Sequence, residues 1–164
     1  MVDKTAFTPD EWKTLLASPL LAGMALTIAD PSGLWGMLQE GMATARSMLG
    51  AKSGPGAGGL AKAVAEELAT SQGRTAAQEM IKSKLTAKTA VDLKQQIIAS
   101  LTATADLLDQ KAADEATPFK VWLKQVSETV ASASSEGGFL GFGGVDVSDT
   151  EKSTLSDIAG ILKV

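Results

Sequence analysis

The sequence contains no cysteine, no histidine and no tyrosine. Without cysteine, the chain can form no disulfide bond, thiolate nucleophile or structural zinc site of the usual kind. Without histidine, it lacks the one side chain whose ordinary pKa lies near neutral pH. Acid–base or metal chemistry would therefore depend on carboxylates, lysines, hydroxyl groups or a bound cofactor, and we expect neither a metal nor a cofactor.

Long hydrophobic runs are also absent. The most apolar stretch, residues 19–29, is too short to span a bilayer, and residues 1–12 lack the basic start and apolar run of a signal peptide. A net charge of −4 argues against a nucleic-acid partner. We therefore expect a soluble cytoplasmic protein with no transmembrane segment.

Basic residues gather in one part of the chain, namely Arg74, Lys82, Lys84, Lys88 and Lys94. Two acids, Glu79 and Asp92, lie among them and dilute their charge. This mixture is more typical of a solvated helix surface than of a phosphate-binding patch.

Helix starts are easy to recognise in what the sequence does contain. Residues 8–11 (TPDE) and 148–151 (SDTE) have the spacing of a capping box. Ser18-Pro19, Asp30-Pro31 and Thr117-Pro118 predict further element boundaries, because a residue before proline is disfavoured in helical conformation.

Apolar residues recur with helical spacing between these signals, and no segment alternates as a strand does. Helices are predicted over 31–50, 60–72, 75–85, 88–112, 118–135 and 149–163, in addition to those that start near residues 9 and 19. Trp12, Trp35 and Trp122 lie near the apolar stripes and are interpreted as core anchors. The fold class is therefore all-α, an irregular bundle of about seven or eight helices in a single domain over residues 1–164.

One glycine-rich segment, residues 53–59 (SGPGAGG), contains the G-x-G-x-x-G pattern of dinucleotide-binding loops. That motif needs a preceding strand so that backbone amides and a helix N-terminus can meet a pyrophosphate. Here a predicted helix precedes it, so we interpret the segment as a flexible linker within the domain.

Acidic residues are the remaining candidates for metal binding. Asp106 and Asp109 lie at i, i+3 beside an apolar stripe, and Asp146 and Asp157 lie in a region that partly resembles a calcium loop. A calcium loop needs a glycine and a bidentate glutamate at fixed positions, and the second capping box explains the same residues. Solvated helix surface is the favoured interpretation, with a hard-cation site as the alternative.

A glycine- and phenylalanine-containing loop spans residues 137–144. Its glycines end the preceding helix and free the backbone to turn. We expect Phe139 and Phe142 to fold back as a plug over the end of the bundle, with Leu140 facing outward. The alternatives are that Phe139, Leu140 and Phe142 form an exposed docking site for a protein partner or a membrane surface, or a mobile lid over a pocket.

Four blocks carry a resemblance that covers most of the chain: FTPDEW (7–12), SPLLAGMALTIADPSG (18–33), VWLKQVSETV (121–130) and GGFLGFGGVDVSDTE (137–151). With these blocks the chain resembles small uncharacterised bacterial all-helical proteins with no assigned activity. Residues 143–158 also resemble the entry to a helix in TerB-like tellurite-resistance proteins. The first resemblance implies a bacterial helical protein and brings no activity with it.

Two functions from different classes fit these observations. The first is a non-catalytic helical protein that acts through contact with a protein partner or as a homo-oligomer, with the 137–144 loop or the small-residue helix faces as its contact surface. The second is a small-molecule binder or carboxylate-based enzyme with a pocket between helices. Closely approached carboxylates around a cavity would favour the second, and acids pointing into solvent would favour the first.

Overall fold

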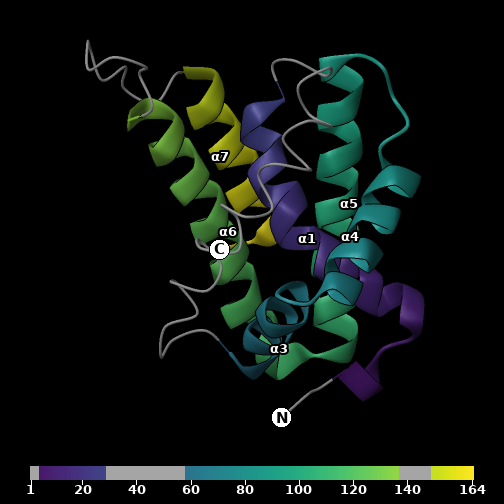
Figure 1. Ribbon diagram of the computed structural model, residues 1–164. Coiled ribbons are helices and arrows are strands. Elements are labelled where there is room, and N and C mark those ends of the chain that lie inside the picture. The colour runs from purple at the N-terminus through teal and green to yellow at the C-terminus, as the bar shows by residue number, and fades with distance from the viewer. Residues whose placement is uncertain (1–3, 29–57, 137–148) are drawn as a thin grey trace.

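The computed structural model describes residues 4–28, 58–136 and 149–164, and every regular element in these ranges is a helix (Figure 1). The elements are a short 3-10 helix η1 (Lys4–Ala6) and the α-helices α1 (Pro9–Thr27), α3 (Gly59–Leu68), α4 (Ser71–Lys84), α5 (Ala90–Lys111), α6 (Ala113–Glu136) and α7 (Asp149–Leu162). The prediction of an all-helical fold is confirmed for these residues. Their six α-helices do not match the predicted seven or eight, and the helix predicted over 31–50 lies outside the described ranges.

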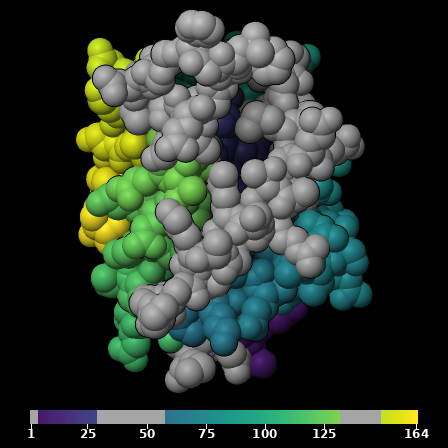
Figure 2. All heavy atoms as spheres, turned by 60° about the vertical axis from the view of Figure 1, so that its left-hand side comes forward, coloured from purple at the N-terminus to yellow at the C-terminus, as the bar shows by residue number. Residues whose placement is uncertain are grey.

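Helix α1 lies at the centre of the described structure (Figure 1). It packs against α4, α5 and α6, and it also contacts α3 and α7. Ten of its 19 residues are buried, as expected of a helix with neighbours on several sides. Helix α7 packs on α5 and α6, and Figure 2 shows α6 and α7 side by side. None of the helices described is long and apolar enough to cross a membrane.

The boundary predicted at Ser18-Pro19 is wrong, because α1 continues through Pro19. Proline has no N–H to donate to the carbonyl oxygen of Leu15, one turn earlier. The Ser18 hydroxyl donates to that oxygen instead, at 2.8 Å. Ser18 and Leu15 are both fully buried, so water cannot reach the Leu15 carbonyl oxygen from the bulk. The Ser18 hydroxyl therefore supplies the hydrogen bond that the proline cannot. Ser18 is therefore a substitute donor inside one long helix.

The boundary predicted at Thr117-Pro118 is wrong as well. Helix α5 ends at Lys111 and α6 begins at Ala113, so Ala112 alone separates them. Pro118 lies in the second turn of α6, where its missing N–H deprives only the carbonyl group of Asp114. Asp114 is exposed, so water can solvate that carbonyl. A proline near a solvated helix start is tolerated for this reason.

Two helix starts agree with the predicted capping boxes. The Thr8 hydroxyl accepts the N–H of Glu11 at 3.3 Å, and the Thr8 N–H donates to Oε2 of Glu11 at 2.7 Å. Helix α7 begins at Asp149, as its capping sequence predicts, although Ser148 itself lies outside the described residues. Local side-chain chemistry therefore places the start of α1, and the start of α7 agrees with its predicted position.

The apolar stripes meet in one core to which α1 and all the other α-helices contribute. Trp12 and Trp122 are 3 % and 1 % exposed, which confirms their interpretation as core anchors, and Trp35 lies outside the described residues. The largest fully buried side chains are Trp122, Phe119, Leu15, Leu16, Leu21, Leu60, Ile81, Ile97, Leu101, Leu108 and Leu123.

Small residues allow α1 and α6 to approach closely. The buried Ser127 hydroxyl of α6 lies 3.1 Å from the Ala22 carbonyl oxygen of α1 and 3.2 Å from the Leu123 carbonyl oxygen of its own helix, and it is the donor to both. A Cβ atom at Gly23 would lie only 3.3 Å from Cγ2 of Val130. A hydrogen bond and a close contact together set the position of α6 on α1.

We expect Ser18→Ala to lower the free energy of unfolding by about 1–3 kcal/mol, because the buried Leu15 carbonyl loses its donor. In a Pro19→Ala background, residue 19 regains an N–H that can bond to Leu15, so Ser18→Ala should have a much smaller effect. Urea denaturation of the four proteins, followed by circular dichroism, measures both effects. Equal destabilisation in the two backgrounds would contradict this role of the hydroxyl.

Candidate functional site

Of the acids considered as metal ligands, the three that the structure describes, Asp106, Asp109 and Asp157, do not form one site. Asp106 is exposed on α5, and Asp146 lies outside the described residues. Asp109 forms an ion pair with a lysine of α6, while Asp157 of α7 lies 3.2 Å from Nζ of Lys94. Lys94 and Asp109 are separated on α5 by about 22 Å of helix length. In the described part of the chain, no three histidine, cysteine or acidic residues are grouped so that they could hold a metal ion.

Asp109 instead neutralises a buried lysine. Nζ of Lys120 lies 2.5 Å from Oδ1 of Asp109, and the side chain of Lys120 is only 6 % exposed whereas that of Asp109 is 42 % exposed. A buried ammonium group is strongly unfavourable without a partner. The pair therefore fixes α6 against the C-terminal half of α5.

The aromatic loop residues Phe139, Leu140 and Phe142 lie outside the described residues, and their plug or docking roles stay predictions. The described helices on either side of the loop are α6, which ends at Glu136, and α7, which begins at Asp149. These two helices pack against each other.

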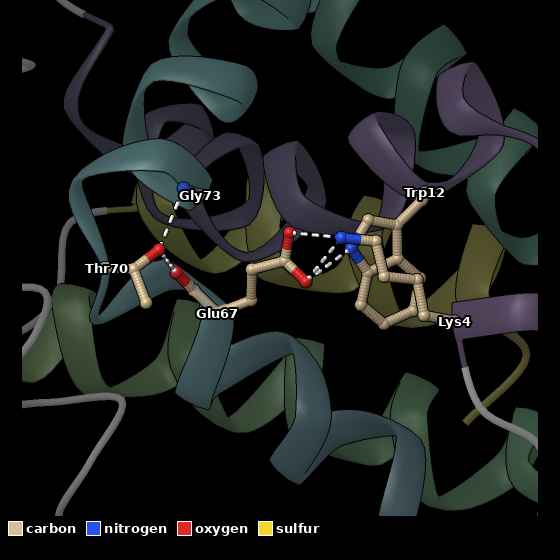
Figure 3. A network of polar contacts seen from close by, with 5 residues as sticks. All are labelled: Lys4, Trp12, Glu67, Thr70 and Gly73. Atoms are coloured by element: carbon tan, nitrogen blue, oxygen red, sulfur yellow. Dashed lines mark hydrogen bonds and ion pairs between the residues drawn. The ribbon is translucent and has the colours of Figure 1, made fainter.

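Sequence reasoning missed the polar network around Glu67, which joins three elements (Figure 3). Its carboxylate accepts hydrogen bonds from Nζ of Lys4 at 2.7 and 3.0 Å and from the indole N–H of Trp12 at 2.9 Å. The Lys4 ammonium also lies 5.7 Å from the centre of the Trp12 ring, within the range of a cation–π contact. The network ties η1 and α1 to α3.

The backbone of Glu67 takes part in the junction between α3 and α4 (Figure 3). The Thr70 hydroxyl donates to the Glu67 carbonyl at 2.7 Å and accepts the Gly73 N–H at 3.0 Å, so Thr70 caps α4. The predicted helices at 60–72 and 75–85 put the junction at residues 73–74. The structure puts it at residues 69–70, because α3 ends at Leu68 and α4 begins at Ser71. A Cβ atom on Gly73 would lie 2.0 Å from the Glu67 carbonyl oxygen, so the junction requires glycine at this position.

Glu11 combines a helix cap with an ion pair across the fold. Its Oε2 accepts the Thr8 N–H and lies 2.7 Å from Nζ of Lys111, at the C-terminal end of α5. The hydrogen bond from Lys111, followed by that from the Thr8 backbone, lowers the pKa of the Glu11 carboxyl group below its ordinary value. The ionised form of Glu11 is therefore favoured in the folded state.

The end of the predicted linker contacts α6. Gly58 precedes α3 and has no side chain to cap it, but Glu115 of α6 accepts the Leu60 N–H at 3.3 Å. A Cβ atom on Gly58 would lie 2.2 Å from Oε2 of Glu115 and 3.1 Å from Cγ of Pro118. Gly58 thus makes room for a cap supplied by another helix, a role that the linker interpretation did not anticipate.

We expect Asp109→Asn to lower the free energy of unfolding by about 1–3 kcal/mol, because it leaves the buried Lys120 ammonium without a charged partner. Lys120→Met is the matched control, since it removes the charge but keeps most of the apolar stem. In the Lys120→Met background, Asp109→Asn should have almost no effect. Chemical denaturation measures both, and an equal loss in the two backgrounds would contradict the pairing.

The low pKa of Glu11 predicts a pH dependence of stability. Its ionised form contributes fully above the ordinary carboxyl pKa of about 4.3, and the contribution is lost as the pH falls through the lower folded-state pKa. Wild type should therefore lose stability more steeply than Glu11→Gln as the pH falls below about 4.3. Asp10→Asn removes a neighbouring acid outside this ion pair and serves as the control. Parallel stability curves for wild type and Glu11→Gln would contradict the prediction.

The polar contacts described above therefore connect helices to one another. No protein-family model, curated protein or solved structure matches the chain. The resemblances to bacterial helical proteins and to TerB-like proteins accordingly stay predictions. The function has to be inferred from this chain's own residues.

Proposed function

We propose that the chain is a non-catalytic, single-domain helical protein of the cytoplasm that acts through contact with another protein or with copies of itself. The observation that supports this most is that many of its acidic side chains are engaged in ion pairs between elements. Glu11, Glu67, Glu79, Asp109 and Asp157 each form an ion pair with a lysine of another element.

Carboxylates used in this way are poor candidates for acid–base or metal chemistry. General acid–base catalysis needs a carboxylate within reach of a substrate. A hard-cation site needs several carboxylate or carbonyl oxygens that converge on one point. In the described helices the paired acids are distributed over different junctions, where each neutralises a lysine. Their arrangement supports a structural role for the charges.

The contact surface that we propose is the 137–144 loop, with Phe139, Leu140 and Phe142 as its contact residues. An apolar group at the tip of a glycine-rich loop is suited to docking when it is exposed, since contiguous apolar patches commonly mark interaction sites. The loop leaves α6 at Glu136 and returns at Asp149, on two helices that pack together.

A second candidate, a small-molecule binder with a pocket between helices, is favoured by one observation. The indole N–H of Trp122 is buried and has no hydrogen-bond partner among the described residues. A ligand that carried an acceptor into this part of the core would satisfy it, because buried N–H groups are normally hydrogen-bonded. The Trp122 indole signal in a proton–nitrogen spectrum would then shift when such a ligand binds.

If the loop is the contact surface rather than the plug expected from the sequence, Phe139→Ala, Leu140→Ala and Phe142→Ala should weaken association and leave the melting temperature almost unchanged. Sedimentation velocity of the purified chain measures self-association, and co-purification compares any partner retained by wild type and variants. Val121→Ala, on an apolar side chain of α6 that is 37 % exposed, is the control and should change neither property.

The plug interpretation predicts the opposite result. Truncating a buried Phe142 should lower the free energy of unfolding by about 3–5 kcal/mol. Such a loss, without an effect on association, would reject the loop as a contact surface.

A further inference from the structure

Seven of the twelve described lysines are neutralised by acids, and five have no ion pair among the described residues. Seven lysines form ion pairs, namely Lys4, Lys13, Lys62, Lys94, Lys111, Lys120 and Lys152. Arg74 donates to the carbonyl oxygen of Ala69 at 2.8 Å. The other described lysines are Lys82, Lys84, Lys88, Lys124 and Lys163. The first three of these five lie within a single stretch of seven residues.

These three lysines lie where α4 leads into α5. Lys82 and Lys84 belong to the last turn of α4, Lys88 lies in the connection that follows, and all three are exposed. The connection arches away from the helices at the upper right of Figure 1.

Gln96 of α5 holds the backbone of this connection in place. Its Oε1 accepts the N–H groups of Thr86 at 2.9 Å and Ala87 at 3.1 Å, and its Nε2 donates to the Thr86 hydroxyl at 3.2 Å. Lys88 therefore projects from a backbone with a defined position.

The two acids that lie among the lysines in the sequence are engaged elsewhere. Glu79 lies 3.4 Å from Nζ of Lys13 on α1. Asp92 accepts the Thr89 hydroxyl at 2.7 Å, and its own N–H donates to that hydroxyl oxygen at 3.2 Å, which caps α5. Only Glu79 is paired with a cation, whereas the Asp92 carboxylate keeps its negative charge because its partner is a neutral hydroxyl group. The dilution of charge expected from the sequence is therefore reduced at Glu79 and remains at Asp92.

An exposed apolar side chain lies next to the lysines in the sequence. Val91, in the first turn of α5, is 68 % exposed, more than the other large hydrophobic side chain exposed in the described residues, Val121 at 37 %. A single exposed valine is ordinary. Val91, however, lies only three residues after Lys88, where the connection enters α5. We call Lys82, Lys84, Lys88 and Val91 the basic edge.

The helix dipole explains only part of this charge. Lysines in the last turn of a helix interact favourably with its free carbonyl groups, which accounts for Lys82 and Lys84. Lys88 lies beyond the end of α4, so its position has no such explanation.

We propose that the basic edge is a docking surface for an acidic peptide segment of a partner protein, with the lysines meeting carboxylates and Val91 meeting an apolar side chain. Local charge complementarity between the three exposed lysines and carboxylates favours this partner, against a net charge of −4 for the whole chain. The edge contains no arginine for bidentate phosphate binding. The described aromatic side chains Phe7, Trp12, Phe119 and Trp122 are all buried, so they supply no platform for stacking nucleotide bases.

The test uses the full chain and a short fluorescein-labelled peptide of glutamates with leucines at its centre, followed by fluorescence anisotropy. The test variant is Lys82→Gln, Lys84→Gln, Lys88→Gln. The control variant is Lys124→Gln, Lys152→Gln, Lys163→Gln, which has the same net charge and leaves the basic edge intact. Thermal melts of both variants confirm that they fold.

We expect the test variant to raise the dissociation constant about tenfold, which corresponds to about twofold for each of three exposed ion pairs. The control variant should leave the dissociation constant unchanged. Val91→Ser should weaken binding of the same peptide, and the peptide with glutamine in place of glutamate should not bind. Equal effects of the two triple variants, or no binding of the acidic peptide by wild type, would overturn the proposal. So would tighter binding of a single-stranded oligonucleotide or of phosphatidylserine vesicles through the same lysines.

The proposal rests on the proposed function in one respect, namely that the protein acts through contact, but it concerns a different surface. Absent peptide binding together with loop-dependent association would reject the basic edge alone. Lysine-dependent peptide binding without any effect of the Phe139, Leu140 and Phe142 variants on association would reject the loop alone.

Discussion

The burial of α1 among α4, α5 and α6 sets the constraint on which the rest of the described structure depends. A helix with neighbours on several sides has little contact with water, so its own polar groups need partners inside the protein. Ser18 supplies one where Pro19 removes a backbone donor, and Ser127 of α6 donates to the Ala22 carbonyl. Both hydroxyl groups are fully buried and serve backbone carbonyls of α1. The centre of the fold therefore depends on two serines as well as on its apolar side chains.

Charged residues act at the junctions around this centre. Glu11 links α1 to the end of α5, Glu67 links η1 and α1 to α3, and Asp109 links α5 to α6. Exposed ion pairs usually contribute little stability, because water solvates both partners well. Those of Glu11 and Glu67 are reinforced by hydrogen bonds to the backbone or to an indole group, and that of Asp109 by the burial of Lys120. These additional contacts restrict how the helices can be positioned relative to one another.

The same distribution of charge bears on function. Acids that hold lysines at helix junctions are committed to the fold, which supports a protein that acts through its surfaces. The lysines without an ion pair between residues 82 and 88 are proposed as one such surface, and the loop at 137–144 is proposed as another. The two differ in chemistry, because the first is basic around a single valine and the second is apolar and glycine-rich. A protein with both could contact two partners, or one partner at two points.

The sequence could predict what depends on neighbours along the chain. Helical periodicity predicted a helix over 88–112, whose apolar stripe includes the buried Leu93, Ile97 and Leu101, and the capping box at Thr8 located the start of α1. The sequence-based prediction failed at the two prolines where the local rule for a helix boundary did not hold. Pro19 lies inside α1, because Ser18 replaces the missing donor. Pro118 lies inside α6, because the carbonyl group that it leaves free belongs to an exposed residue.

For the candidate site, the sequence could name acids but not their partners. Trp12 and Glu67 are 55 residues apart, and Glu11 and Lys111 are 100 residues apart, so no local pattern could pair them. The sequence by itself thus determined the helical fold class, the apolar faces and the caps, since these follow from bonds and spacing within a few residues. Only the tertiary structure decided which carboxylates hold lysines and which lysines stay unpaired, because a charged side chain finds its partner only when packing brings distant helices together.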